Sequence, residues 1–339
     1  MRPSWILSVG LLLNLSVSFV LEQNDSCSHR VLPVFVKDSQ AKSVAVLAPA
    51  DFEAKVQGKP VNILSIASDQ RPHRLLVIVD LTHSMKNGGT GEPPRWRWQL
   101  ALARHFFEQN RQKAQIALLI FSKQINDVVN FYQGNAAVDI KLQQAAKGPD
   151  DLRNDSKGST TLRDAILQGL QLFDDPSSAD AVYVLSDAVE SNTAAQGFSE
   201  VILRLNATEV RLFAVLLQQE IGYRNKTAEE RLGPEELSEI ARKSGGAILS
   251  TAEWHKDRVS LSANADGKAT TQETLTNLYQ AILQDSLLEL ELPFAVEKNE
   301  SLQLKLSDSA HDRWKGAQIL YPESVVGCRA NTPAAKIAQ

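Results

Sequence analysis

A short apolar run that ends in an acid is the most constraining feature of this chain. Residues 75–79 read Leu-Leu-Val-Ile-Val, and Asp80 follows directly. A run this short is typical of a strand that is covered on both faces, as in a parallel sheet, rather than of a buried helix. Hydroxyl side chains then alternate beyond the acid, at Thr82 and Ser84. In an open α/β sheet, ligands bind beyond the carboxyl ends of the strands, so these oxygens lie where a site is expected.

The side chains beyond this strand also predict the class of metal that such a site would take. Carboxylate and hydroxyl oxygens, with no Cys or His at ligand spacing, suit a hard cation. Mg²⁺ is the ion that we expect first, and Mn²⁺ or Ca²⁺ would suit the same ligands. The loop at residues 85–94 is rich in glycine and proline, so helical periodicity resumes only after it.

Three segments resemble the metal-ion-dependent adhesion site of von Willebrand factor type A domains. The Asp-x-Thr-x-Ser pattern at 80–84 stands where that family usually has Asp-x-Ser-x-Ser. Residues 157–166, Lys-Gly-Ser-Thr-Thr-Leu-Arg-Asp-Ala-Ile, resemble the family's Gly-Gly-Thr segment at the start of a helix. A second strand-like run, at 181–186, is followed by an acid at the family's last metal position. The resemblance implies a divalent cation held by Asp80, Thr82, Ser84, Thr160 and Asp187.

Two residues depart from the pattern of that family. His83 stands where the family usually has a small residue, and Ala188 replaces the glycine that usually follows the last acid. Both changes leave the oxygen ligands in place but alter the loops that carry them. A plainer interpretation also fits the three segments, because Ser, Thr and Asp are favoured as caps of ordinary helices.

The middle of the chain alternates strands and helices, which indicates a doubly wound, mostly parallel sheet with a Rossmann-like architecture. We expect this type A domain over residues 72–285. Besides 75–79, strands are expected at 115–121, 127–132, 182–186, 210–217 and 247–250, and helices at 95–109, 136–146, 162–173, 198–205, 234–243 and 271–285. Pro234 suits the first turn of its helix, where a missing N–H costs nothing.

Both segments that flank this domain have the sequence pattern of β-strands. Residues 28–70 and 286–329 each contain only a few short strands, and a lone hairpin is marginal in water. We therefore expect the flanks to pack together as one small β-rich module, with the α/β domain as an insertion. The N-terminal strands and the Gly-Lys-Pro turn at 58–60 resemble the opening of a bacterial (acidobacterial-type) group of secreted proteins called VWFA-related.

The two ends of the chain indicate export. Arg2 precedes an apolar run over residues 5–20, the pattern of a signal peptide at residues 1–20. No later segment approaches the length of a spanning helix, so we expect a secreted or cell-envelope protein without a membrane span once the signal is removed. An uncleaved signal that serves as an anchor is the alternative. In an oxidising compartment Cys27 and Cys328 invite a disulfide, although two free thiols are also compatible with the sequence.

Charge and motifs argue against several classes of function. A net charge of −4 without a Lys/Arg cluster argues against a nucleic-acid partner. A phosphatase with an aspartate nucleophile would need a second acid where Thr82 stands. Ser84 lacks the Gly-x-Ser-x-Gly turn that presents an acyl-transfer nucleophile.

We therefore expect an adhesion-type binding module rather than an enzyme. Because two acids cancel at most the charge of a divalent ion, the open side of the site would attract a Glu or Asp of a protein partner. A metal-free structural domain of the cell envelope is the alternative, and a magnesium-dependent hydrolase is a more remote one.

Overall fold

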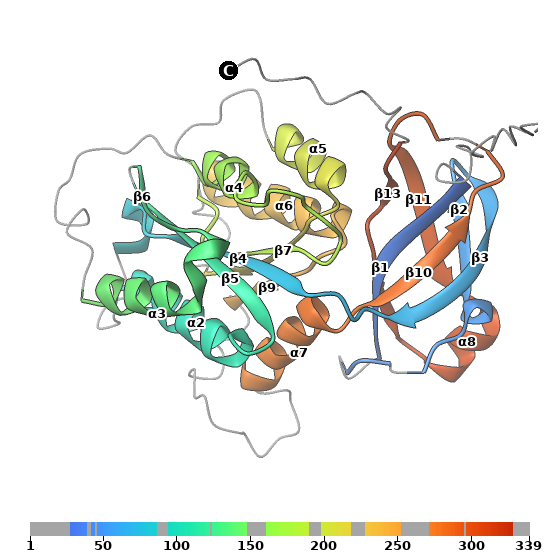
Figure 1. Cartoon of the computed structure of the whole chain (residues 1–339), viewed down its shortest axis with the longest axis horizontal. Helices are drawn as coiled ribbons and strands as arrows, with labels where there is room; N and C mark the ends of the chain where they lie inside the picture. Colours follow the sequence, from blue (N-terminus) through green and yellow to red (C-terminus); the bar gives the residue numbers. More distant parts are fainter. Residues whose placement is uncertain are drawn as a thin grey trace, which may run out of the picture.

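The computed structural model describes residues 28–38, 42–44, 46–86, 94–122, 124–147, 161–189, 198–217, 228–251, 271–294 and 296–327. These residues form two sheets that lie side by side (Figure 1). A six-stranded sheet comes from the middle of the chain, and a seven-stranded sheet comes from the two flanks. Within the described residues, no helix is both long enough and apolar enough to cross a membrane.

The six-stranded sheet is mostly parallel, as the alternation of strands and helices predicts. Its order is β6-β5-β4-β7-β8-β9, so β4 lies in the interior between β5 and β7. β6 runs antiparallel to β5 and is the hairpin partner that the sequence predicts. The strands are β4 (His73–Asp80), β5 (Ala114–Phe121), β6 (Ile125–Val129), β7 (Ala181–Ser186), β8 (Arg211–Leu216) and β9 (Ile248–Ser250).

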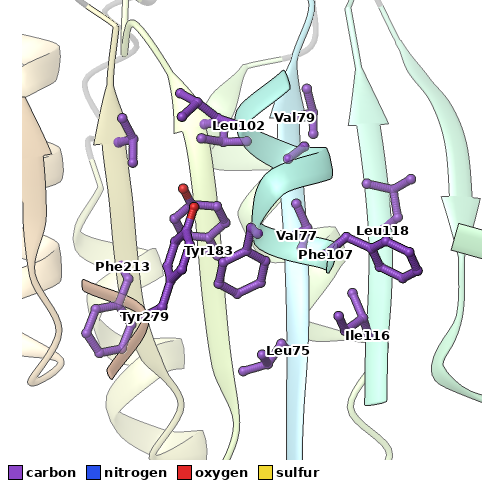
Figure 2. Packing of buried hydrophobic residues seen from close by; sticks show 14 of the residues in the cluster. Leu75, Val77, Val79, Leu102, Phe107, Ile116, Leu118, Tyr183, Phe213 and Tyr279 are labelled. Carbon is purple, nitrogen blue, oxygen red and sulfur yellow. The ribbon is translucent and has the colours of Figure 1, made fainter. Parts of the chain in front are cut away.

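Helices cover both faces of this sheet, which explains why β4 is apolar along its length. Leu75, Val77 and Val79 pack against α2, α3 and α7, in the core that Figure 2 shows in part. Leu76 and Ile78 point to the opposite face and pack against α4, α5 and α6. Each fully buried Leu, Ile or Val contributes roughly 1.5–3 kcal/mol, so the end of this strand is held firmly. The helices are α2 (Arg95–Asn110), α3 (Gly134–Ala145), α4 (Leu162–Leu170), α5 (Ser199–Thr208), α6 (Ala228–Lys243) and α7 (Thr271–Leu283), with a 3₁₀ turn, η3 (Phe131–Gln133), before α3.

Helix α6 begins earlier than the sequence predicts. The expectation that Pro234 opens this helix is wrong, because the helix starts at Ala228 and holds the proline inside it. Residues 228–232 read Ala-Glu-Glu-Arg-Leu and are all strong helix formers, so they extend the helix by more than one turn before the proline. The C-terminal boundary agrees with the prediction, since Gly245 just beyond it has a positive φ of 82°.

The two flanks form one antiparallel sheet, which confirms the predicted β-rich module. Its order is β12-β1-β10-β3-β2-β11-β13, so the C-terminal strand β10 lies between the N-terminal strands β1 and β3. The module has an apolar core of its own, which includes Val34, Val56, Leu288 and Leu304. The elements are β1 (His29–Lys37), η1 (Pro49–Asp51), β2 (Phe52–Val56), β3 (Lys59–Ser68), β10 (Ser286–Glu291), β11 (Glu300–Leu306), α8 (Asp308–Arg313), β12 (Gln318–Leu320) and β13 (Ser324–Val325). Helix α8 is too short for periodicity to predict it.

The chain crosses between the two sheets twice, and the crossings lie next to each other. The N–H of Asp69, just after β3, donates to the carbonyl of Asp285, just before β10, at 2.9 Å. The carboxylate of Asp285 pairs with Arg211 of β8, and both side chains are buried. Phe35 of β1 packs into the core of the six-stranded sheet. The α/β domain is therefore an insertion that is fastened to the module where the chain enters and leaves it.

The ends of the described chain also come together on the module. The Nε of Arg30 donates to the carbonyl of Val326 at 3.2 Å. Cys27 and Cys328 lie outside the described residues, as does the predicted signal peptide at 1–20. The disulfide and the signal therefore stay predictions.

Candidate functional site

The structure brings four of the five predicted site residues together at the carboxyl ends of two adjacent strands. Asp80 is the last residue of β4, and Asp187 directly follows β7. The two strands are parallel neighbours, with Val79 opposite Leu185. The 3₁₀ turn η2 (His83–Lys86) follows β4 and carries Ser84 toward the second acid. The convergence therefore follows from strand order.

The hydroxyl of Ser84 joins the two halves of this site. Its Oγ donates to Asp187 Oδ1 at 3.2 Å and lies 3.1 Å from Thr82 Oγ1. Side chains that are 103 positions apart in the sequence are thus in direct contact. The expected arrangement requires Ser84 and Asp187 to be neighbours, and the structure meets that requirement.

Asp80 is buried and held from two sides. Its Oδ1 accepts from the N–H of Thr82 at 2.9 Å, which fixes the start of the loop. Its Oδ2 accepts from the hydroxyl of Ser186 at 2.5 Å. The same Ser186 oxygen accepts from the N–H of Ala188 at 2.8 Å, so this serine orders the ends of both strands. The sequence motifs do not reveal this role, because Ser186 also fits as the last residue of an ordinary strand.

Asp187 is 2% exposed, and its carboxylate accepts hydrogen bonds from three groups. Oδ1 accepts from Ser84 and from the N–H of Val189 at 3.1 Å, and Oδ2 accepts from Arg95 Nη1 at 3.1 Å. Burial and the negative charge of Asp80 raise the pKa of Asp187 to about 6, against the opposing effect of Arg95. Two acids this close together, away from water, favour the arrival of positive charge.

Arg95, which the sequence motifs miss, supplies part of that positive charge. It is the first residue of α2, and its side chain is 16% exposed. Besides Asp187, its guanidinium donates to the carbonyl of Leu217 at 3.2 Å and to the carbonyl of Ser84. One signal could have found it. A cation in the first turn of a helix opposes the helix dipole, so an acid nearby is expected to compensate.

The third predicted hydroxyl ligand, Thr160, lies outside the described residues. The helix that should follow it is present. Thr161 caps α4 by accepting from the N–H of Asp164 at 3.1 Å. Thr160 therefore precedes a helix start, as the resemblance implies, and its role as a ligand stays a prediction.

The two departures from the family pattern, Ala188 and His83, affect the backbone differently. Ala188 adopts a left-handed backbone with φ of 54°, which explains why glycine is usual at this position. Its carbonyl also faces Gly233 of α6, where any added Cβ would lie 1.8 Å from the Ala188 oxygen. The backbone of His83 lies in η2, which keeps the turn that places Ser84.

The donor set fits a hard cation. Two carboxylates and two hydroxyls converge, and all the donors are oxygen, the ligand type that Mg²⁺, Mn²⁺ and Ca²⁺ prefer. Within the described ranges, no group of three or more His, Cys, Asp or Glu side chains is placed to hold a metal. An ion at this site would therefore depend on its hydroxyl ligands as well as on the acids.

Comparison with protein families identifies this part of the chain. Residues 75–190 match the model of the von Willebrand factor type A domain, a span that runs from β4 past Asp187. The chain contains a von Willebrand factor type A domain. Domains of this type are commonly protein-interaction modules rather than enzymes. The narrower resemblance to secreted VWFA-related bacterial proteins stays a prediction.

Comparison with whole proteins adds little beyond the domain. No curated protein matches the chain. A von Willebrand factor type A structure from Catenulispora acidiphila is 12% identical, with 88% of this chain and 74% of that chain covered and a TM-score of 0.39. A mutant of the PilB minor pilin from Streptococcus sanguinis is 10% identical, with coverages of 63% and 62% and a TM-score of 0.39. The human COPII-coat protein Sec24c is 10% identical, with coverages of 76% and 44% and a TM-score of 0.36.

Proposed function

We propose that this protein is an exported binding module that grips an acidic residue of a partner protein through a divalent cation. The observation that supports the proposal most strongly is the contact of Ser84 with both Thr82 and Asp187. It joins the loop after β4 to the end of β7 and gathers oxygen donors from both. Export rests on the signal-like segment at 1–20 alone.

The residues that would hold the ion are Asp80, Thr82, Ser84 and Asp187, with Thr160 as a further hydroxyl. When bound, the ion would supply a positive centre for a carboxylate oxygen from outside. Ser186 holds Asp80 in place for this role, and the N–H of Val189 does the same for Asp187. Mg²⁺ is the ion that we favour, with Mn²⁺ and Ca²⁺ as its competitors.

The charge balance favours an acidic partner more strongly than the motifs alone indicate. The sequence-based count sets two acids against one divalent ion, which leaves the site neutral. Arg95 adds a third group, and its positive charge lies directly on Asp187. With an ion present, the ion and the nearby Arg95 together outweigh the two acids, even when Arg95 no longer contacts Asp187, and this net positive charge attracts a carboxylate of the partner.

Partner capture with and without chelator tests this proposal. Ser84→Ala and Asp80→Ala should abolish capture of a partner from envelope or culture extract while the protein stays folded. EDTA should do the same to the unchanged protein. Ser309→Ala is the matched control, because it removes an exposed hydroxyl on the module, far from the site in sequence. Partner binding that survives both EDTA and Ser84→Ala would contradict the metal-dependent mechanism.

A metal-free structural domain is the second candidate, and one observation favours it. Arg95 already contributes a positive charge to the acidic pair, as a bound ion would. In that case Mg²⁺ and Mn²⁺ should leave the melting temperature unchanged. A rise in melting temperature with either ion would favour the binding module instead.

A further inference from the structure

Arg95 is placed by a set of contacts that converge from three parts of the sheet edge. Its guanidinium contacts Asp187 after β7, the carbonyl of Leu217 after β8, and the carbonyl of Ser84 in η2. Arg97 has the same side chain two residues later and behaves differently. It is exposed, and its guanidinium lies over the ring of Trp96 at 5.3 Å. The contacts with Asp187, Leu217 and Ser84 are therefore made by Arg95 and are not shared by Arg97, which lies in the same turn of α2.

In the proposed function, two cations compete for the carboxylate of Asp187: the guanidinium of Arg95 and the divalent ion. Asp187 Oδ2 accepts from Arg95, while Oδ1 accepts from Ser84, one of the hydroxyls that would hold the ion. A divalent ion and a guanidinium on one carboxylate repel each other, and the low exposure of both side chains reduces screening by water. One cation at this acid must weaken the hold of the other, and the coupling is reciprocal.

We propose that Arg95 is a built-in competitor of the divalent cation, which holds Asp187 while no ion is bound and yields that carboxylate when the ion binds. This inference rests on the proposed function and deepens it, because it names what sets the ion affinity of the site. Arg95 stabilises the ion-free protein and raises the ion concentration at which the module becomes competent to bind its partner.

The two carbonyl contacts give this competition a structural consequence. Because Arg95 also holds the carbonyls of Ser84 and Leu217, its release from Asp187 loosens its hold on the ends of two loops. Ion binding is thereby linked to the turn η2 and to Leu217 just after β8. Arg95 acts here as a positioning residue, since it would contact neither the ion nor the partner.

Calorimetric titration of the full chain with Mn²⁺ tests the proposal, with Arg95→Gln as the main variant and Arg97→Gln as its matched control. Both substitutions remove one positive charge from the first turn of α2, but only the first removes it from Asp187. We expect Arg95→Gln to bind Mn²⁺ about tenfold more tightly or better, and Arg97→Gln to stay within about twofold of the unchanged protein. Arg95→Lys keeps the charge and should stay close to the unchanged protein.

Thermal unfolding in EDTA and in Mn²⁺ gives a second readout that does not depend on a partner. Arg95→Gln should melt a few degrees lower in EDTA, since it leaves two buried acids without their counterion, and should gain more from Mn²⁺ than Arg97→Gln does. If the unchanged protein binds Mn²⁺ but Arg95→Gln binds it no more tightly than Arg97→Gln, the competition is overturned while the proposed function stands. If none of the proteins binds Mn²⁺, the metal site itself is wrong and the competition falls with it.

Discussion

Removal of one carboxylate at the junction of the two sheets, in Asp285→Asn, is expected to destabilise the protein strongly. The Arg211 side chain is 1% exposed, and its Nη1 donates to Asp285 Oδ1 at 2.8 Å while Nη2 donates to the other oxygen. The guanidinium also donates to the carbonyls of Ala281 and Ile282 at the end of α7, at 3.2 and 3.0 Å. In the variant, the charge of Arg211 stays buried without its counterion, which costs about 3–5 kcal/mol. That is a large part of a total stability of about 5–15 kcal/mol.

Urea unfolding at about pH 8 measures this loss of stability. Glu53→Gln is the control, because the Glu53–Lys305 pair is 48% and 62% exposed and water screens its attraction. The double variant Arg211→Met/Asp285→Leu should recover most of the loss, because an apolar pair replaces the buried charges. An Asp285→Asn protein as stable as Glu53→Gln would refute the reasoning, as would a double variant no more stable than the single one.

Two further predictions concern the loop after β7 and the ends of the chain. Gly233→Ala should lower the melting temperature by several degrees in differential scanning fluorimetry, because its Cβ would lie 1.8 Å from the carbonyl oxygen of Ala188. Gly58→Ala, in the turn between β2 and β3, meets nothing within 4 Å and should lose only the roughly 1–2 kcal/mol of a non-glycine residue at positive φ, so equal losses would contradict the steric argument. Thiol titration of the unfolded, unreduced exported protein should detect neither Cys27 nor Cys328, and two titratable thiols would reject the disulfide.

The sequence predicts the half of the site that is local in the chain. Asp80, Thr82 and Ser84 follow one apolar strand, and their spacing alone places them at a sheet edge. Asp187 could be added because β7 is a second apolar strand, and parallel strands end on the same side. The fold was predictable for the same reason. Buried strands that alternate with helices leave few arrangements, and two flanks too short to fold separately must find each other.

The interactions that tune the site were not predictable, because they depend on side chains from distant segments. The place of Arg95 at a helix start predicts an acid nearby, but the sequence does not show that this acid is Asp187, 92 positions away. Arg211 opens an apolar strand, but its burial is tolerable only beside Asp285, 74 positions away. Such pairings follow from the packing of whole elements, whereas local spacing reports only on neighbours along one strand or helix.

The neighbouring crossings between the two sheets determine how the molecule would carry tension. β4 starts at the junction and runs eight residues, about 26 Å, to Asp80, so a partner held there pulls at the end of the sheet remote from the module (Figure 1). The covalent path back to the module runs through the C-terminal end of β3 and the N-terminal end of β10, where Ser68 lies opposite Ser286. A force on the α/β domain therefore pulls β3 and β10 from the same end, so it does not shear the hydrogen bonds between these two strands. The ladder between β10 and β1 resists in shear along its length, with several hydrogen bonds loaded at once rather than opened one by one.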